Sequence, residues 1–238
     1  MAEDNVVLRF MNKMTDLFVL NLLFLICSIP IVTIGASLTA MYAVSLRSVR
    51  YGDGYVVKTF FKSFKECFWQ ATLAWILCLI SGLLLYIDYN FWTQAQEEMG
   101  EIAGVMKVAS LVVAIGLLIV FQWVFPVIAK MKDRFWRQVR NAAAMAVAYF
   151  IPYTLICLVI SIGAGYLAYT NVAAMIVMLM VGFATVTYMQ SFFIYRVFAK
   201  FIQETPASED DFLYQQYDQD KAEPQEEEAF SGEDETEN

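Results

Sequence analysis

Thirty consecutive residues, from Leu17 to Leu46, carry no charged side chain. About 20 apolar residues are enough for a helix to cross a bilayer core, so this run is longer than one straight span requires. Pro30 lies near its middle, lacks a backbone N–H and disfavours helical geometry at the preceding residue. Thr33 and Gly35 follow, and a hydroxyl there can satisfy carbonyls that a break sets free. The run therefore predicts a first membrane helix that is broken at Pro30.

The remainder of the chain also has a membrane-like composition. Of its 238 residues, 59% are hydrophobic and 17% are charged, whereas soluble domains have about 45–50% and about 25%. The sequence predicts an all-α polytopic membrane protein with about five transmembrane helices. The expected spans are residues 17–46, 71–90, 105–128, 142–168 and 172–197.

Two further segments place cations on one helical face and aromatic residues on another. The cations are Lys58, Lys62 and Lys65 and, at a constant offset later in the chain, Lys130, Arg134 and Arg137. Such basic amphipathic helices lie in the membrane interface against anionic headgroups, and they can also dock a cytoplasmic partner. The shared layout predicts a duplicated unit, residues 56–128 and 130–200. Two cytoplasmic edges that both need cations would give the same pattern.

The net charge of −8 combines two parts of opposite sign. Residues 201–238 hold 14 of the 24 acidic side chains and one lysine, which predicts a disordered acidic tail. The cations of the body flank the first and third loops, so the positive-inside bias places these loops and the C-terminus in the cytoplasm. With five spans the N-terminus lies outside, and residues 1–16 form a lead-in or a short interfacial helix. If the broken first helix re-enters instead of crossing, the N-terminus is cytoplasmic as well.

Three amides inside the predicted spans are candidates for function: Asn21, Gln122 and Gln190. Polar groups are costly in hydrocarbon, so they face the bundle interior or a cavity. They either line a path for a solute or hydrogen-bond one helix to another, a contact worth about 0.6 kcal/mol in membranes. The hinge residues that complete this candidate set are Pro30, Thr33 and Gly35.

The sequence contains no enzyme motif that we recognise. It has no histidine, which removes the commonest general base and the commonest metal ligand. Phosphate-binding loops of the form GxxxxGK[ST] and nucleophile elbows of the form GxSxG are also missing. Its four cysteines, Cys27, Cys67, Cys78 and Cys157, form no CxxC pair. We expect no catalytic residue, metal, cofactor or nucleic-acid partner.

A longer pattern extends over the first third of the chain. The run LNLLFLICSIPIVTIGASLTAMYAV, a basic edge and then GDGYVVKTFFKSFKECFWQATLAWIL resemble the start of the YesL-like family of bacterial membrane proteins. The resemblance covers about residues 20–77, and beyond it only the pattern of spans agrees. It implies a multi-pass protein of the bacterial cell membrane, often encoded beside carbohydrate uptake systems, with no assigned activity.

These observations support two functions of different classes. The first is an accessory or regulatory component of carbohydrate uptake, whose basic helices contact anionic lipid headgroups and a carbohydrate ABC-type transporter. The alternative is an autonomous small-solute transporter or channel, built from the broken first helix and the two repeated units. The oligomeric state is left open.

Overall fold

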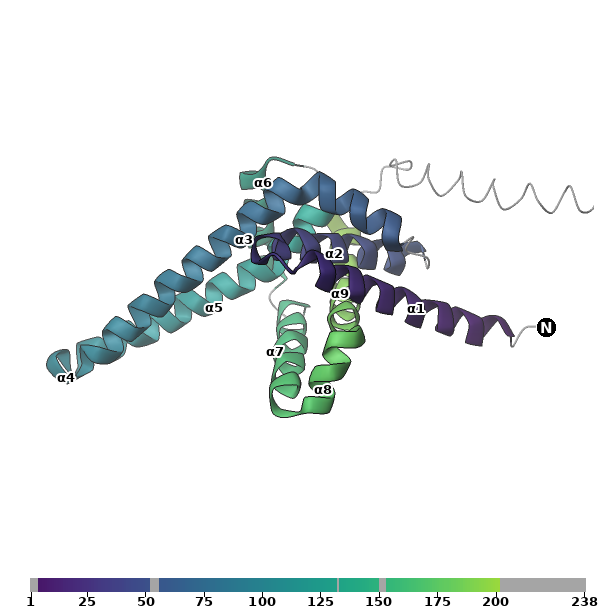
Figure 1. The fold of residues 1–238 in the computed structure, drawn as a ribbon. Coiled ribbons are helices and arrows are strands. Elements are labelled where there is room, and N and C mark those ends of the chain that lie inside the picture. The colour runs from purple at the N-terminus through teal and green to yellow at the C-terminus, as the bar shows by residue number, and fades with distance from the viewer. Residues whose placement is uncertain (1–3, 52–55, 132, 150–152, 202–238) are drawn as a thin grey trace, which may run out of the picture. The chain divides into compact units, whose positions relative to one another are not determined.

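The computed structural model describes residues 4–51, 56–131, 133–149 and 153–201, and over these residues the chain is helical, with no strand (Figure 1). The predicted all-α polytopic class is confirmed. Four helices are long and apolar enough to cross a membrane: Ile31–Arg50, Val56–Gln94, Glu101–Lys130 and Val172–Ala199. Leu155–Thr170 is a shorter apolar helix. The chain divides into two units, Met1–Val197 and Phe198–Asn238, and the first is described below. The predicted acidic tail beyond residue 201 lies outside the described residues.

The predicted break at Pro30 is present. Helix α1 (Asp4–Cys27) ends before it, and a 3-10 turn η1 (Ile31–Thr33) and helix α2 (Ile34–Tyr51) follow. The backbone of Pro30 is extended, with φ −75° and ψ 121°. The Thr33 hydroxyl lies 2.6 Å from the Cys27 carbonyl and 2.7 Å from the Pro30 carbonyl, so it can donate to either. A hydroxyl thus satisfies carbonyls freed by the break, as the sequence predicted.

The two halves of the predicted first span fold back on each other. Lys13 Nζ donates to Ser48 Oγ. Lys13 lies well before the end of α1 at Cys27, and Ser48 lies equally far beyond the start of α2 at Ile34. This contact joins points that are equally far from the turn on α1 and on α2, so the two helices form an antiparallel hairpin. Residues 17–46 are therefore not one kinked span, because the extended Pro30 reverses the chain instead of bending it. Since α1 begins at Asp4, the lead-in is part of the same helix.

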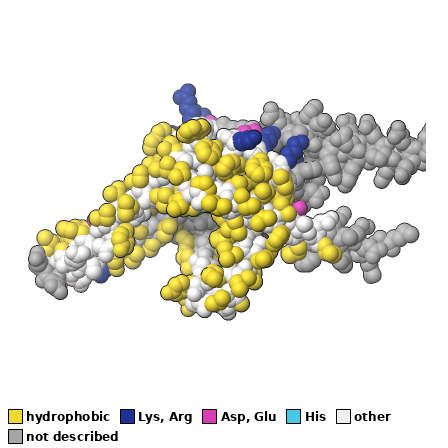
Figure 2. Space-filling view, viewed as in Figure 1, with side chains coloured by type: hydrophobic (Ala, Val, Ile, Leu, Met, Phe, Trp, Pro, Cys, Tyr) yellow, Lys and Arg dark blue, Asp and Glu magenta, His cyan; other side chains and the backbone are white. Residues whose placement is uncertain are grey.

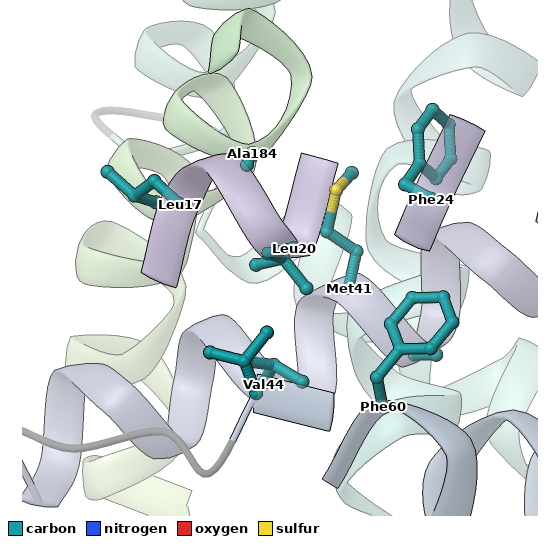
Figure 3. Packing of buried hydrophobic residues seen from close by; sticks show 9 residues of the cluster. Leu17, Leu20, Phe24, Met41, Val44, Phe60 and Ala184 are labelled. Atoms are coloured by element: carbon teal, nitrogen blue, oxygen red, sulfur yellow. The ribbon is translucent and has the colours of Figure 1, made fainter. Parts of the chain in front are cut away.

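The core of the first unit forms around this hairpin. Apolar residues of α1 recur at intervals of three and four, which places them on one face of the helix. They pack against α2, and residues from α3 and α9 close the cluster (Figure 3). The residues labelled there are Leu17, Leu20, Phe24, Met41, Val44, Phe60 and Ala184.

Helices α2 and α3 (Val56–Gln94) come into close contact at Gly35. A Cβ atom at this position would lie 2.5 Å from the carbonyl oxygen of Ala71 and 2.6 Å from the Cβ of Trp75. The Trp75 indole N–H donates to the Ile31 carbonyl at 2.8 Å. Small residues let membrane helices approach closely. Gly35 was expected as part of a hinge. In the structure its backbone on α2 packs directly against Ala71 and Trp75 of α3.

Helix α3 is one uninterrupted helix of 39 residues, about 58 Å long. The sequence predicted a basic interfacial helix followed by a separate span, and that boundary is not found. The stretch from Val56 to Ser81 contains neither proline nor glycine, so nothing in it ends a helix. A short helix α4 (Gln96–Met99) and Gly100, with φ 54°, turn the chain into α5 (Glu101–Lys130). The distal parts of α3 and α5 expose apolar side chains, including Leu83 and Val112.

The predicted fourth span, residues 142–168, is divided between two helices. The second basic segment is not one helix as predicted: Lys130 ends α5, Arg134 is the extended N-cap of α6 (Phe135–Ala148), and only Arg137 lies in α6. Helix α7 (Leu155–Thr170) follows. Pro152 stands between them in the sequence, outside the described residues, and proline cannot continue a helical hydrogen-bond ladder. The element order resembles that of the proposed first copy, but α3 is continuous where this copy is broken. The duplication stays a prediction.

The last part of the first unit is a helical hairpin. After α7, Asn171 caps α8 (Val172–Val177) by accepting a hydrogen bond from the Ala173 N–H at 2.9 Å. A π-helical turn, η3 (Met178–Gly182), then leads into α9 (Phe183–Phe201). Together these elements cover the predicted fifth span. The π turn has no signal in the sequence that we identified.

Candidate functional site: a buried amide network and a basic edge

Asn21 joins the first helix to the π turn near the end of the unit. Its side chain is fully buried. Nδ2 donates to the Leu179 carbonyl at 2.6 Å, and Oδ1 accepts from the Ala184 N–H at 3.0 Å. The two backbone groups have the sequence separation that a π-type bond would connect. The Asn21 amide therefore bonds to both a carbonyl and an N–H that could otherwise form a π-type hydrogen bond with each other.

Gln190 is the centre of a second network and joins α9 to three other helices. Its Oε1 accepts from the Tyr42 hydroxyl at 2.5 Å and from Gln122 Nε2 at 3.1 Å. Its Nε2 donates to Ser161 Oγ at 2.7 Å and to the Cys157 carbonyl at 3.2 Å. A glutamine amide offers two acceptor sites and two N–H donors, and all four are used. The predicted candidates Gln122 and Gln190 thus meet, and Asn21 lies apart on the π turn.

Sequence reasoning missed the partners of these amides. Tyr42 and Ser161 are ordinary residues of apolar helices, and nothing in their spacing indicates a shared partner. The same holds for Trp123, whose indole N–H donates to Thr154 Oγ1 at 2.9 Å. The Thr154 hydroxyl lies 3.1 Å from the Tyr149 carbonyl, so it can donate to a group at the end of α6. A threonine again satisfies backbone at a helix break, as Thr33 does.

Replacing Gln190 by leucine is expected to destabilise the protein by about 1–2 kcal/mol. The change removes four hydrogen bonds, but Ser161 keeps its bond to the Cys157 carbonyl at 3.0 Å, and hydroxyls can rotate to other partners. Thermal unfolding in mild detergent, followed by tryptophan fluorescence, measures the loss. Gln122→Leu is the matched control, because Gln122 is only partly buried and its bond to Gln190 is a single one. Equal losses in the two variants would contradict the central role of Gln190.

Asp88 makes a further polar contact between α3 and α5. Ser110 Oγ donates to Asp88 Oδ2, and the Trp92 indole N–H donates to Oδ1 at 3.1 Å. Both donors are within or near the apolar parts of these helices. The carboxylate is therefore held by neutral donors on two helices. Among the described residues, no three Cys, Asp or Glu side chains are grouped to hold a metal ion.

The six cations of the two basic segments form what we call the basic edge. It comprises Lys58, Lys62, Lys65, Lys130, Arg134 and Arg137. Gln70 Nε2 donates to the Asp133 carbonyl at 3.0 Å, and the Cys67 thiol lies 3.7 Å from the Ile128 carbonyl. These contacts bring the first basic segment beside the turn between α5 and α6. Two cationic segments that are far apart in the sequence thus meet at one edge.

Most of the basic edge is open to its surroundings. Lys58, Lys65, Arg134 and Arg137 are exposed, and Lys62 and Lys130 are partly buried. Arg137 pairs with Asp133 at 3.0 Å, but an exposed pair of this kind contributes little to stability. Figure 2 shows Lys and Arg side chains gathered along one border of the visible face, above a mostly hydrophobic surface.

Comparison with known proteins gives one match. A family model described as "Protein of unknown function, DUF624" matches residues 17–89. This segment contains the hairpin of α1 and α2, the Gly35 contact and the first half of the basic edge. No curated protein and no solved structure matches the chain. The chain is therefore similar over its first third to a family whose function is not assigned.

Proposed function

We propose that the protein is an accessory or regulatory component of a carbohydrate uptake system in the bacterial cell membrane. It would dock through the basic edge onto a cytoplasm-facing surface of an ABC-type transporter. The resemblance of residues 20–77 to the YesL-like family supports the link with carbohydrate uptake. The family model that matches residues 17–89 assigns no activity.

The observation that carries this proposal is the contrast between the two polar features. The buried amides Asn21 and Gln190 form hydrogen bonds with other groups of the same chain. Gln190 uses all four of its hydrogen-bonding positions and Asn21 uses both its nitrogen and its oxygen, and amides bonded in this way act as contacts between helices. The exposed cations Lys58, Lys65 and Arg134 are instead available to an outside partner. An acidic protein surface or anionic headgroups would complement them, each cation near a headgroup contributing about 1 kcal/mol.

Reversing the charge of the basic edge is expected to abolish recovery of the partner. We would replace Lys58, Lys65 and Arg134 by glutamate in the tagged full-length chain. The protein would be isolated from its native membrane in gentle detergent, and co-purifying proteins identified by mass spectrometry. The wild-type chain should recover permease or solute-binding subunits, and the triple variant should lose them while accumulating normally.

Lys107→Glu is the matched control for this experiment. Lys107 belongs to the other end of α5, where its Nζ lies 5.2 Å from the ring centroid of Tyr89, so it is not part of the basic edge. This variant should recover the same subunits as the wild type. A wild-type chain recovered alone, or a triple variant with undiminished recovery, would contradict the accessory function.

The transporter alternative has one specific observation in its favour. Helices are interrupted at Pro30 and between α6 and α7, and the continuous helix Val172–Ala199 contains a π turn at Met178–Gly182. Interrupted helices often form substrate sites in transporters. Flux of candidate sugars into liposomes that contain the purified protein would support this function, and loss of that flux in Gln190→Leu would place the path beside the amide network.

A further inference from the structure

We propose that α1 and α2 form a re-entrant hairpin, which enters the membrane from one side and returns to that side. Its tip, residues 26–32, lies among the acyl chains of a single leaflet. The N-terminal end of α1 then faces the same compartment as the C-terminal end of α2. The occupant of the exposed tip is lipid hydrocarbon.

The first argument is the length of the two arms. The uncharged part of α1 runs from Leu17 to Cys27, and that of α2 runs from Ile34 to Leu46. At about 1.5 Å per residue these segments are about 16 and about 20 Å long, against about 30 Å for a bilayer core. Ile31–Arg50 counts as a possible span by length and composition. Its last turn, however, includes Arg47 and Arg50.

The second argument is the direction of the arms. At the open end of the hairpin, Lys13 Nζ donates to Ser48 and lies 5.0 Å from the ring centroid of Tyr188 on α9. Nearer the tip, the ring centroids of Phe24 and Phe183 are 5.4 Å apart. The tip of the hairpin lies against Ala71 and Trp75 of α3, whereas its open end lies beside Val56 at the start of α3, so the hairpin runs alongside the first half of α3. The open end of the hairpin therefore lies toward the start of α3, which carries Lys58.

The two ends of the hairpin differ in polarity. The open end carries Lys13, Asp16 and Ser48, which lie at a small cavity of about 10 Å³ that is otherwise lined mainly by apolar side chains. The tip carries no charge and exposes large apolar side chains. Their exposed fractions are 53% for Ile26, 78% for Ile29, 66% for Ile31 and 53% for Val32. A polar open end and an apolar tip are the pattern of a segment inserted from the water side.

The third argument is where the tip touches α3. The Trp75 indole N–H donates to the Ile31 carbonyl at 2.8 Å, and α3 continues for several turns beyond Trp75 to its end at Gln94. Along that continuation, α3 exposes Leu79, Ile80 and Leu83. The apolar tip is thus continuous with a helix surface that faces lipid if α3 crosses the membrane. Contact with water would be unfavourable for the apolar side chains of the tip and of α3. Contact with the lipid hydrocarbon would cover both surfaces.

The test is single-cysteine labelling of the full-length protein in its membrane. The four native cysteines are replaced by serine or alanine, and one cysteine is introduced at a time: Met11→Cys, Ile29→Cys, Arg134→Cys or Tyr169→Cys. Each side chain is exposed at its position. A membrane-impermeant maleimide is applied to spheroplasts or to inside-out vesicles. Arg134→Cys reports the side of the basic edge, and Tyr169→Cys reports the side of the turn between α7 and α8.

The impermeant maleimide is expected to label Met11→Cys from the side on which it labels Arg134→Cys. It should not label Met11→Cys from the side on which it labels Tyr169→Cys. Ile29→Cys should resist the impermeant reagent from both sides and react only after the membrane is dissolved in detergent, because the reactive thiolate forms poorly in hydrocarbon. Reaction of Met11→Cys from the side of Tyr169→Cys, or of Ile29→Cys with the impermeant reagent, would overturn the proposal. If the cysteine-free chain does not accumulate, an N-terminal epitope tag on the native chain gives the same readout. It would be probed on spheroplasts before and after permeabilisation, and detection before permeabilisation would overturn the proposal.

Discussion

A Gly35→Val protein is expected to lose about 3 kcal/mol of stability. A Cβ at this position would lie 2.5 Å from the Ala71 carbonyl oxygen and 2.6 Å from the Trp75 Cβ. Both atoms belong to the backbone of α3 or are attached to it, so no side-chain rotation makes room. The helices must move apart, which loosens the packing of Ala36 and Ala40. A fall in the apparent Tm in mild detergent, followed by tryptophan fluorescence, measures the effect.

Gly82→Val and Gly116→Val are controls with the same chemistry and open surroundings. No atom lies within 4 Å of a Cβ built at either position. Neither variant should lose more than about 0.5 kcal/mol, because valine replaces a residue with a lower helix propensity. Gly35→Ala should already show most of the loss, since the Cβ alone makes the clash. If Gly35→Ala melted like the wild type, the close approach of α2 and α3 would be wrong.

Asn21→Leu is expected to cost about 2–3 kcal/mol. The variant leaves the Leu179 carbonyl and the Ala184 N–H without their partners in a buried setting. Unlike hydroxyls they cannot rotate to other partners, and they can bond to each other only if the π turn closes and α9 shifts. We therefore expect a larger loss than for Gln190→Leu. The apparent Tm should fall by about 5 °C or more for a chain of this length.

Asn90→Leu is the control for Asn21→Leu, since it makes the same substitution at an exposed bond. Asn90 Nδ2 donates only locally, to the Tyr86 carbonyl at 2.7 Å. Its loss should be a few tenths of a kcal/mol. Hydrogen exchange of the Ala184 amide gives a second readout, because that N–H should lose protection in Asn21→Leu. Matching melting curves for the two leucine variants would show that the Asn21 amide does not hold the π turn.

The break at Pro30 and its repair by Thr33 could be predicted because both depend on neighbours in the sequence. A proline removes an N–H, and a hydroxyl shortly after it is within reach of the freed carbonyls. The direction of the chain after the break could not be predicted. A kink and a reversal have the same local residues, and the choice depends on what Lys13 and Phe24 meet on distant helices.

The boundary before the second span was wrong for a related reason. Lysine spacing showed that Lys58, Lys62 and Lys65 share a face, and that inference does not require the helix to end at Gln70. Without proline or glycine, the hydrogen-bond ladder continues from Val56 into the span. The end of the lysine-bearing face therefore indicates where α3 passes from a polar to an apolar environment. It does not indicate where the helix ends, because no proline or glycine interrupts the backbone there.

Two of the three candidate amides, Asn21 and Gln190, are buried in the bundle and Gln122 is partly buried, but their partners were not predictable. Asn21 meets two backbone groups, and every residue has such groups, so no side-chain pattern identifies Leu179 or Ala184. Tyr42 and Ser161 reach Gln190 only because α2 and α7 pack beside α9. The sequence therefore indicates which side chains require hydrogen-bond partners. The tertiary structure determines which groups those partners are.

The π turn at Met178–Gly182 also sets a rotational phase. Each residue of an α-helix turns the side-chain direction by about 100°. A π turn holds about one more residue than an α turn, so the helix after it is rotated by roughly that angle relative to an uninterrupted helix. Gln190 follows the turn on α9 and points at Tyr42 and Ser161 in this rotated frame. By holding the turn open, Asn21 determines the face of α9 that reaches the rest of the bundle.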